Sequence, residues 1–367
     1  MAKIKILHAI GNLSMGGAEF QCLQLANNLD TDKYEVAIVY LHDGPNPDVK
    51  EHVRRYQVER GRYFDLLGLA KRVDAIVGDF QPDIIQAWLP EVVSVPAALS
   101  AHKRKIPLIS GHRKTLHFVG DWNQLVRDRL RALQYLYADQ IISNFEVRDE
   151  PTLFQWLYKK KAGMVIHNGY NLKQLRDLPS LKLEKPSEYR LIYAGRLAPQ
   201  KGLMTAFEAM SLLVEEGHDV HLTLFGVGPK PYEHELKKKV QELNLDEYIT
   251  FFGEYKRWQA YADDATALIF PTRGEGTSNV VLEALAVGLP VVISNISMAK
   301  ELLSDGDNAA VVQTDKPSDW RSRIRGLMKD CGMQQRLSAN GRELADRFSI
   351  RTMVEAYDAE YQKLLNG

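Results

Sequence analysis

The clearest chemical pattern in the sequence is a pair of cations bracketed by glycines. Arg196 and Lys201 stand five residues apart within residues 195–202, directly after an apolar run of strand type. Where a parallel strand leads into a helix, two fixed cations can bind one diphosphate and neutralise a leaving group. Two solvated charges on a surface loop are the alternative interpretation of this spacing.

Two carboxylates form a second pattern farther along the chain. Glu275 stands between two glycines, and Glu283 follows eight positions later inside an otherwise apolar helical stretch. An unpaired buried charge is costly, so Glu283 should face either a partner or a ligand hydroxyl. A salt bridge from Glu283 to a neighbouring helix is the alternative.

The segment between these carboxylates should begin a helix. We expect Thr277 or Ser278 to cap it. The exposed backbone N–H groups of the first turn would then form an anion site, made by Gly276, Thr277, Ser278 and Asn279.

Two further glycine loops follow predicted strands. Gly16 and Gly17 lie before the first helix, where backbone can approach a phosphate or a sugar. Gly11 and Gly16 have P-loop spacing, but Gly17 stands where that motif needs lysine, which disfavours a nucleoside triphosphatase. A tight turn without a ligand is the alternative.

The second glycine loop begins at Gly226 and resembles the start of a dinucleotide fingerprint. Pro229 and Pro231 interrupt it, so we expect a strand-to-helix turn beside a ligand cleft and not a nicotinamide site.

The elements that must position these groups are short apolar runs alternating with helical periods, which is typical of parallel sheets covered by helices. In the first part of the chain we expect strands at 4–9, 36–41, 83–87, 108–110, 140–143 and 164–166. In the second part we expect strands at 189–193, 220–225, 248–252, 267–270, 291–294 and 310–312, with helices at 203–214, 233–243 and 278–287.

This alternation predicts an α/β protein with two tandem Rossmann-like, doubly wound domains and a cleft between them. The linker should lie within residues 168–186. We expect domains at 1–168 and 169–347, and a last helix in 348–367 that crosses back to the first domain.

Composition narrows the class of protein. The chain has 367 residues, 45% of them hydrophobic and 26% charged, as in an ordinary globular enzyme. Lysine and arginine total 47, as do aspartate and glutamate, so a dedicated nucleic-acid binder is disfavoured. Cys22 and Cys331 have no metal-ligand spacing, and no run of about 18 apolar residues occurs. We therefore expect a cytoplasmic protein without structural zinc.

The motifs together resemble family 4 of the retaining nucleotide-sugar glycosyltransferases, which have the two-Rossmann GT-B fold. The matching segments occur in the family's order over most of the chain: 16–19, 167–170, 194–202, 226–229 and 275–284, followed by 288–292.

The resemblance implies a role for each group. Arg196 and Lys201 would bind the donor diphosphate, Glu275 would contact the transferred sugar, and Glu283 would bind the ribose hydroxyls. The other implied donor-binding residues are Gly16, Gly17, Gly226, Gly276, Thr277, Ser278, Asn279 and Leu282. Similar enzymes need no metal or other cofactor, because cations and helix N-termini stabilise the diphosphate.

The implied activity is transfer of a sugar, with retention at the anomeric carbon, from a nucleoside diphosphate donor, UDP favoured over GDP. The acceptor would be a hydroxyl of a glycan or lipid-linked precursor in bacterial surface-polysaccharide synthesis. A nucleotide-sugar epimerase on the same fold and a non-catalytic nucleotide-sugar-binding partner subunit are the alternatives.

One position departs from the family pattern. Many relatives carry a histidine after the strand that corresponds to residues 108–110, and some carry arginine. Here Arg113 fits this position best by spacing, followed by His112 and then His117. Each could instead be a surface charge or a loop residue.

The first domain should bind the acceptor, and its basic clusters offer a contact with anionic membrane. Lys159, Lys160 and Lys161 follow Trp156, and another group surrounds Trp122. The second group contains Arg127, Arg129 and Arg131, interleaved with apolar residues. A solvated helix face is the alternative in both places.

Overall fold

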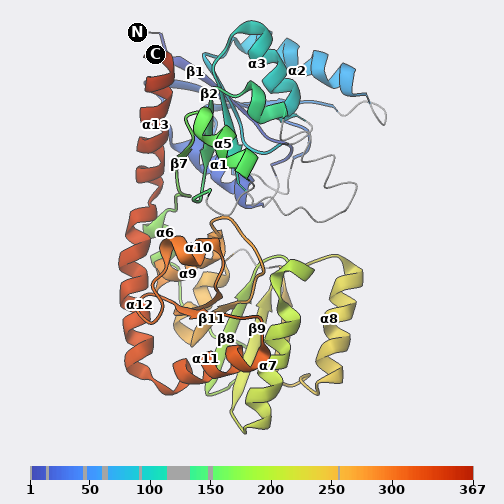
Figure 1. The fold of residues 1–367 in the computed structure, drawn as a ribbon, viewed down its shortest axis with the longest axis vertical. Coiled ribbons are helices and arrows are strands. Elements are labelled where there is room, and N and C mark those ends of the chain that lie inside the picture. The colour runs from blue at the N-terminus through green and yellow to red at the C-terminus, as the bar shows by residue number, and fades with distance from the viewer. Residues whose placement is uncertain are drawn as a thin grey trace. The chain divides into compact units, whose positions relative to one another are not determined.

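The computed structural model describes residues 2–13, 16–43, 48–59, 65–90, 93–113, 133–147, 152–254 and 257–366. It divides into two compact units, shown in Figure 1. The first unit contains residues 1–170 and 350–367, and the second contains residues 171–349.

The first unit is built on a parallel sheet in the order β3-β2-β1-β4-β5-β6-β7. Its strands are β1 (Ile4–Ala9), β2 (Tyr34–Tyr40), β3 (Val53–Gln57), β4 (Ile84–Ala87), β5 (Leu108–His112), β6 (Gln140–Ser143) and β7 (Met164–Val165). Its helices are α1 (Gly17–Asn28), α2 (Leu66–Phe80), α3 (Ser94–Arg104), α5 (Thr152–Lys160) and α13 (Ile350–Asn366).

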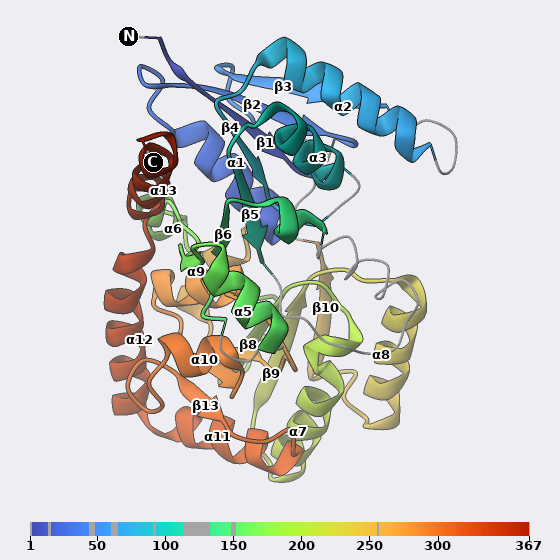
Figure 2. The same ribbon diagram turned by 45° about the horizontal axis from the view of Figure 1, so that its top comes forward.

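The central strands of this sheet are buried on both faces, and successive side chains of each strand point to opposite faces. Ile6 packs with residues of α1 and α13, whereas its neighbour Leu7 packs with residues of α2 and α3. Figure 2 shows α2 and α3 across the strands from α1. The last helix, α13, packs against α1 and contributes Tyr357 and Tyr361 to the core on that face.

The second unit is a parallel sheet in the order β10-β9-β8-β11-β12-β13. Its strands are β8 (Tyr189–Ala194), β9 (Val220–Phe225), β10 (Ile249–Gly253), β11 (Ala267–Phe270), β12 (Val291–Ser294) and β13 (Ala310–Val312). Its helices are α6 (Leu172–Arg176), α7 (Leu203–Glu215), α8 (Lys230–Glu242), α9 (Asn279–Val287), α10 (Ser297–Leu302), α11 (Pro317–Lys329) and α12 (Cys331–Ala345). Short 3-10 turns are η1 (Pro199–Lys201), η2 (Trp258–Asp264) and η3 (Asp346–Phe348).

The predicted pair of doubly wound α/β domains is confirmed. Six predicted strands, at 4–9, 140–143, 220–225, 267–270, 291–294 and 310–312, have the bounds observed. The others differ by one or two residues at one or both ends. The edge strand β3 was not predicted, and neither was α6, which lies inside the segment expected to hold the linker.

No helix in the described part of the chain is both long and apolar enough to cross a bilayer.

Candidate functional site

The predicted donor residues of the second unit lie in loops at the carboxyl ends of β8, β9 and β11, the edge where open α/β sheets bind ligands. The first two loops continue the sheet pairing. The Gly195 N–H donates to the Phe225 carbonyl oxygen at 2.9 Å, and the Leu197 N–H donates to the Val227 carbonyl oxygen at 3.0 Å.

Glycines allow this close approach. Gly226 has φ +155°, and a Cβ there would lie 1.9 Å from the Gly195 carbonyl oxygen; a Cβ on Gly228 would lie 2.1 Å from the Leu197 carbonyl oxygen. The Gly228 N–H donates at 2.7 Å to Glu233 in the first turn of α8. Packing between two loops therefore explains these glycines, as expected for a strand-to-helix turn.

Lys201 and Glu275 come together from different loops. Lys201 ends η1, and its Nζ forms an ion pair with Glu275 Oε1 while lying 5.2 Å from the centre of the Phe270 ring. Their side chains are only 11% and 27% exposed. The two loops are also tied by the Arg273 N–H, which donates to the Gln200 carbonyl oxygen at 2.9 Å. The pairing satisfies two poorly solvated charges at the loop edge.

Arg196 differs from Lys201 in having an exposed side chain. Its backbone is fixed, because the Tyr193 hydroxyl donates to the Arg196 carbonyl oxygen at 3.0 Å. Burial, reinforced by the negative charge of Glu275, raises the pKa of Tyr193, so this donor keeps its proton. No described residue forms an ion pair with the Arg196 guanidinium. Its charge is therefore available to an anionic ligand.

The loop after Glu275 leads into α9 as predicted, but the cap is different. Ser278 occupies the N-cap position, yet its side chain makes no capping hydrogen bond, which corrects the expectation for this residue. Instead its N–H donates to the Met298 thioether at 3.1 Å. A thioether is a weak acceptor, so this N–H can still donate to a stronger acceptor. Thr277 and Leu282 are both buried.

Glu283 lies one residue beyond Leu282 on α9. Gln259 Nε2 donates to Glu283 Oε2 at 2.6 Å, and the Trp258 side chain also bonds the carboxylate. Burial raises the pKa of Glu283 to about 7, and these two hydrogen bonds oppose the rise. No cation of the described chain pairs with Glu283, so the salt bridge considered as its alternative role is not formed.

In the first unit, the loop after β1 brings Gly16 to the N-cap of α1, and Gly17 begins that helix. A Cβ on Gly16 would lie 2.0 Å from a Glu19 carboxylate oxygen, so the glycine leaves room for this acidic side chain in the first turn.

The neighbours His112 and Arg113 point to opposite faces of the sheet. His112 is 1% exposed; its Nδ1 lies 2.7 Å from the Tyr135 hydroxyl, and its ring centre lies 4.5 Å from that of Phe154. These contacts place the imidazole in the aromatic core beside α5. His112 is therefore a packing residue in this structure.

Unlike His112, the Arg113 side chain is partly exposed. Its guanidinium lies 4.5 Å from the centre of the Trp88 ring. Its Nη1 donates to Asn168 Oδ1 at 3.1 Å, and its Nη2 donates to the Tyr357 hydroxyl. Its Nε is buried and has no hydrogen-bond partner among the described residues. Of the three candidates for this position, Arg113 best fits a ligand contact, while His117 lies outside the described residues.

Sequence reasoning missed one polar group on the Arg113 face. Trp88 Nε1 donates to His8 Nδ1 at 3.1 Å, so His8 carries its proton on Nε2, an atom without a partner in the described chain. Burial lowers the pKa of His8 to about 3, which keeps the ring neutral. A histidine in a strand whose only other polar residue is Lys5 was the available signal.

The predicted basic clusters are only partly described. Residues 114–132, which include Trp122, Arg127, Arg129 and Arg131, lie outside the described residues. In the described ranges, no group of three histidine, cysteine, aspartate or glutamate side chains is arranged to hold a metal ion.

Comparison with known families identifies the family of this chain. The model for glycosyl transferases group 1 matches residues 179–344, and the model for glycosyltransferase family 4 matches residues 15–174. The chain is a family 4 glycosyltransferase. The two matches cover separate domains in the order of the GT-B fold, which agrees with the two sheets.

Individual relatives agree with this assignment. The glycosyltransferase is 24% identical over 350 residues to an uncharacterized glycosyltransferase of Haemophilus influenzae, covering 94% of this chain and 96% of the relative. It is 23% identical over 347 residues to the lipopolysaccharide core biosynthesis glycosyltransferase LpsE of Rhizobium meliloti, covering 93% and 94%. The crystal structure of Anabaena HepE in complex with UDP-glucose superposes with a TM-score of 0.81 at 20% identity, covering 98% of this chain and 100% of HepE.

Proposed function

We propose that this glycosyltransferase transfers a sugar from a nucleoside diphosphate donor, UDP in preference to GDP, to a hydroxyl of a glycan or lipid-linked glycan in bacterial surface-polysaccharide synthesis. The observation that carries the proposal is the loop edge of the second unit. There the Arg196 guanidinium forms no ion pair with a described residue, and a largely buried Lys201 is paired with Glu275. HepE, bound to UDP-glucose, and LpsE, named for lipopolysaccharide synthesis, support the donor and the pathway class.

Each group has a role in this proposal. Arg196 and Lys201 bind the diphosphate, together with the backbone N–H groups at the start of α9 and those of Gly16 and Gly17. Glu283 accepts hydrogen bonds from the ribose hydroxyls. Glu275 accepts from hydroxyls of the transferred sugar, and its pairing with Lys201 holds it at the loop edge.

The proposed reaction retains the anomeric configuration. The acceptor hydroxyl oxygen attacks the anomeric carbon from the face on which the phosphate leaves. As the bond from carbon to phosphate oxygen breaks, the acceptor proton moves to the departing phosphate. Arg196 and Lys201 stabilise the negative charge that develops on the diphosphate, so the step is proposed to need no metal. Arg113 contacts the donor sugar or the acceptor through N–H groups of its partly exposed guanidinium.

The surface around α5 combines exposed apolar side chains with lysines. On α5 the Trp156 side chain is 55% exposed, and Lys160 Nζ lies 4.9 Å from its ring centre. Lys161 Nζ donates to the carbonyl oxygen of Leu136, whose side chain is 57% exposed. Exposed apolar side chains beside lysines suit the headgroup region of an anionic membrane. We propose peripheral contact here, on the cytoplasmic face.

The test is a panel of UDP-, GDP-, ADP- and dTDP-sugars, with free nucleoside diphosphates as controls. Binding is followed by calorimetry and thermal shift, and turnover by release of the nucleoside diphosphate. A donor should raise the melting temperature by mass action and be hydrolysed slowly without acceptor. Binding without any release or transfer would favour a non-catalytic partner subunit, and interconversion of two sugars on the nucleotide would favour an epimerase.

A further inference from the structure

We propose that Tyr357, on the last helix, is a positioning residue that holds the Arg113 guanidinium in the orientation in which it meets the substrate. This inference rests on the role proposed above for Arg113. It assigns a task in the reaction to a helix that lies 244 residues away in the sequence.

The contacts of Arg113 leave its side chain little rotational freedom. Trp88 covers one face of the guanidinium, while Asn168 and Tyr357 accept hydrogen bonds from its two terminal nitrogens. A guanidinium is planar, so a stacked face and two fixed edge contacts set the direction of its remaining N–H groups. Without the Tyr357 hydroxyl, the plane could turn about the contact with Asn168.

The two described acceptors of Arg113 are both neutral. Asn168 offers an amide oxygen and Tyr357 a phenolic oxygen, and no carboxylate of the described chain bonds the guanidinium. Burial raises the pKa of Tyr357, so the phenol stays protonated near neutral pH. A carboxylate in the same place would orient Arg113 but would also neutralise it. A phenol orients the cation and leaves its charge for an anionic or hydroxyl-rich substrate.

Tyr357 is itself held rigidly. Its side chain is 0% exposed, and its ring centre lies 6.1 Å from that of Trp88 and 6.0 Å from that of Tyr361. Gln86 bonds the hydroxyls of both tyrosines. The hydroxyl that meets Arg113 is thus part of a packed cluster, which makes it a suitable fixed point.

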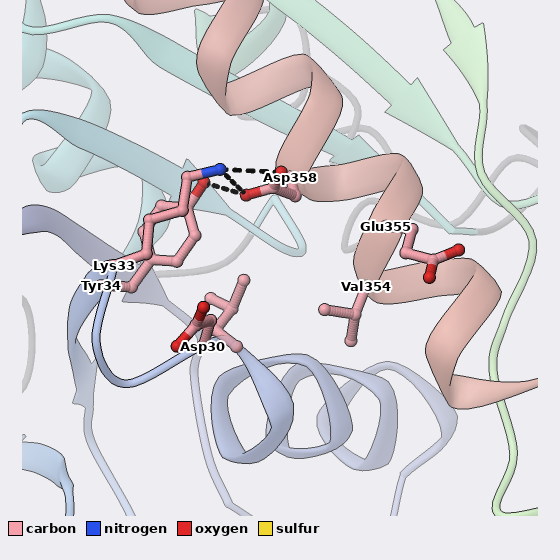
Figure 3. Close-up of a pocket in the computed structure, with 7 residues that line it drawn as sticks. Asp30, Lys33, Tyr34, Val354, Glu355 and Asp358 are labelled. Atoms are coloured by element: carbon pink, nitrogen blue, oxygen red, sulfur yellow. Dashed lines mark hydrogen bonds and ion pairs between the residues drawn. The ribbon is translucent and has the colours of Figure 1, made fainter.

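The docking of α13 has other polar anchors, so the Tyr357 hydroxyl is not needed for that purpose. Asp358 accepts from Lys33 Nζ at 2.6 Å and from the Tyr34 hydroxyl at 2.5 Å, beside an open pocket between α13 and the end of α1 (Figure 3). Glu360 accepts a hydrogen bond from Gln140. Removing the one oxygen of Tyr357 should therefore leave the helix in place.

The decisive experiment compares Tyr357→Phe with Tyr361→Phe, a matched control on the same helix with the same burial and no bond to Arg113. Tyr357→Phe should lower kcat at least about tenfold, because it removes a hydrogen bond to a charged group. The donor Kd should stay close to that of the wild type, and the melting temperature should fall no further than in Tyr361→Phe, which also loses a buried hydrogen bond. Tyr361→Phe should change kcat by less than about twofold. Equal losses in the two variants, or an unchanged kcat in Tyr357→Phe, would overturn the proposal.

A double-mutant cycle shows whether Tyr357 acts through Arg113. In the Arg113→Met background, Tyr357→Phe should cost no further turnover, because the group that it positions is gone. A full loss in that background would refute the coupling. Arg113→Lys tests the same point without changing the helix: lysine keeps the charge but cannot bind both acceptors in one plane, so its kcat should fall about as far as in Tyr357→Phe. Wild-type turnover in this variant would contradict fixed orientation.

The same data separate this inference from the proposed function. A wild-type protein that neither binds nor turns over any nucleotide sugar contradicts the proposed function. Turnover that survives Arg113→Met leaves the transferase activity standing and removes both the role of Arg113 and that of Tyr357.

Discussion

Replacing Glu283 by glutamine should make the protein more stable at alkaline pH while weakening donor binding. The carboxyl loses hydration in the folded protein, and its pKa rises from the ordinary 4.5 to about 7. At about 1.36 kcal/mol for each pH unit, the buried carboxylate costs at most about 3 kcal/mol of unfolding free energy. Part of the side chain reaches solvent, so we expect a loss of about 1–2 kcal/mol.

The sign of the pH dependence follows from the raised pKa. The folded state binds this proton more tightly than the unfolded state does. The stability that Glu283 contributes is therefore full below about pH 4.5 and is lost as the pH rises through about 7. Glu283→Gln does not titrate. Its melting temperature should be close to that of the wild type near pH 5 and about 4 °C higher at pH 8, for a domain of this size.

Donor binding should change in the opposite direction. Ribose hydroxyls donate to a carboxylate more strongly than to an amide oxygen, so Glu283→Gln should weaken UDP binding about tenfold or more at pH 8. Wild-type affinity should rise between pH 6 and pH 8 as Glu283 ionises, and affinity in the variant should change less. Calorimetric titration with UDP and melting curves at both pH values provide the measurements.

Glu275→Gln serves as the matched control. Glu275 is paired with Lys201, so its neutralisation leaves a largely buried cation without its partner and should not stabilise the protein at either pH. The reasoning about Glu283 is refuted if Glu283→Gln shifts the melting temperature equally at pH 5 and pH 8, or if UDP binds the variant as tightly as the wild type.

Three further predictions concern the second unit. Arg196→Ala and Lys201→Ala should each lower kcat about 100- to 1,000-fold, as removal of an electrostatic donor does elsewhere, and near wild-type rates would rule out their role at the diphosphate. Excess chelator should leave the transfer rate within about twofold, whereas abolished transfer would contradict a metal-independent reaction. Gly226→Ala should lower the unfolding free energy in denaturant titrations by about 2 kcal/mol or more, since its Cβ would meet the Gly195 carbonyl oxygen at 1.9 Å. Gly217→Ala, also at positive φ but with nothing within 4 Å, should cost clearly less, and equal losses would show that strain in φ dominates.

The fold was predictable where strands are buried on both faces. Runs such as β11 and β12 are almost wholly apolar and stand between helical periods, so hydrophobicity alone locates them. The strand β3 was missed because it lies at the edge of its sheet and exposes Arg54 and Arg55. An exposed edge strand lacks the apolar run on which the prediction depends.

Some residues of the candidate site were likewise predictable from the sequence, and others were not. Glycine-bracketed charges after strands located Arg196, Lys201 and Glu275, because such loops fall at one edge of a parallel sheet. Sequence spacing could not choose between His112 and Arg113. Successive residues of an extended chain face opposite sides of a sheet. Only the contacts in the structure show that His112 packs against Tyr135 while Arg113 lies against Trp88.

Transfer from a nucleoside diphosphate sugar can be tested by following one reaction to its product. The sugar donor that the panel identifies is incubated with enzyme and an acceptor glycan, and proton NMR reports the anomeric configuration of the new linkage while nucleoside diphosphate release is quantified. The account predicts a glycoside with the anomeric configuration of the donor and one nucleoside diphosphate released per linkage formed. An inverted linkage would contradict the retaining mechanism, and the absence of binding by every nucleotide sugar would contradict the proposed function itself.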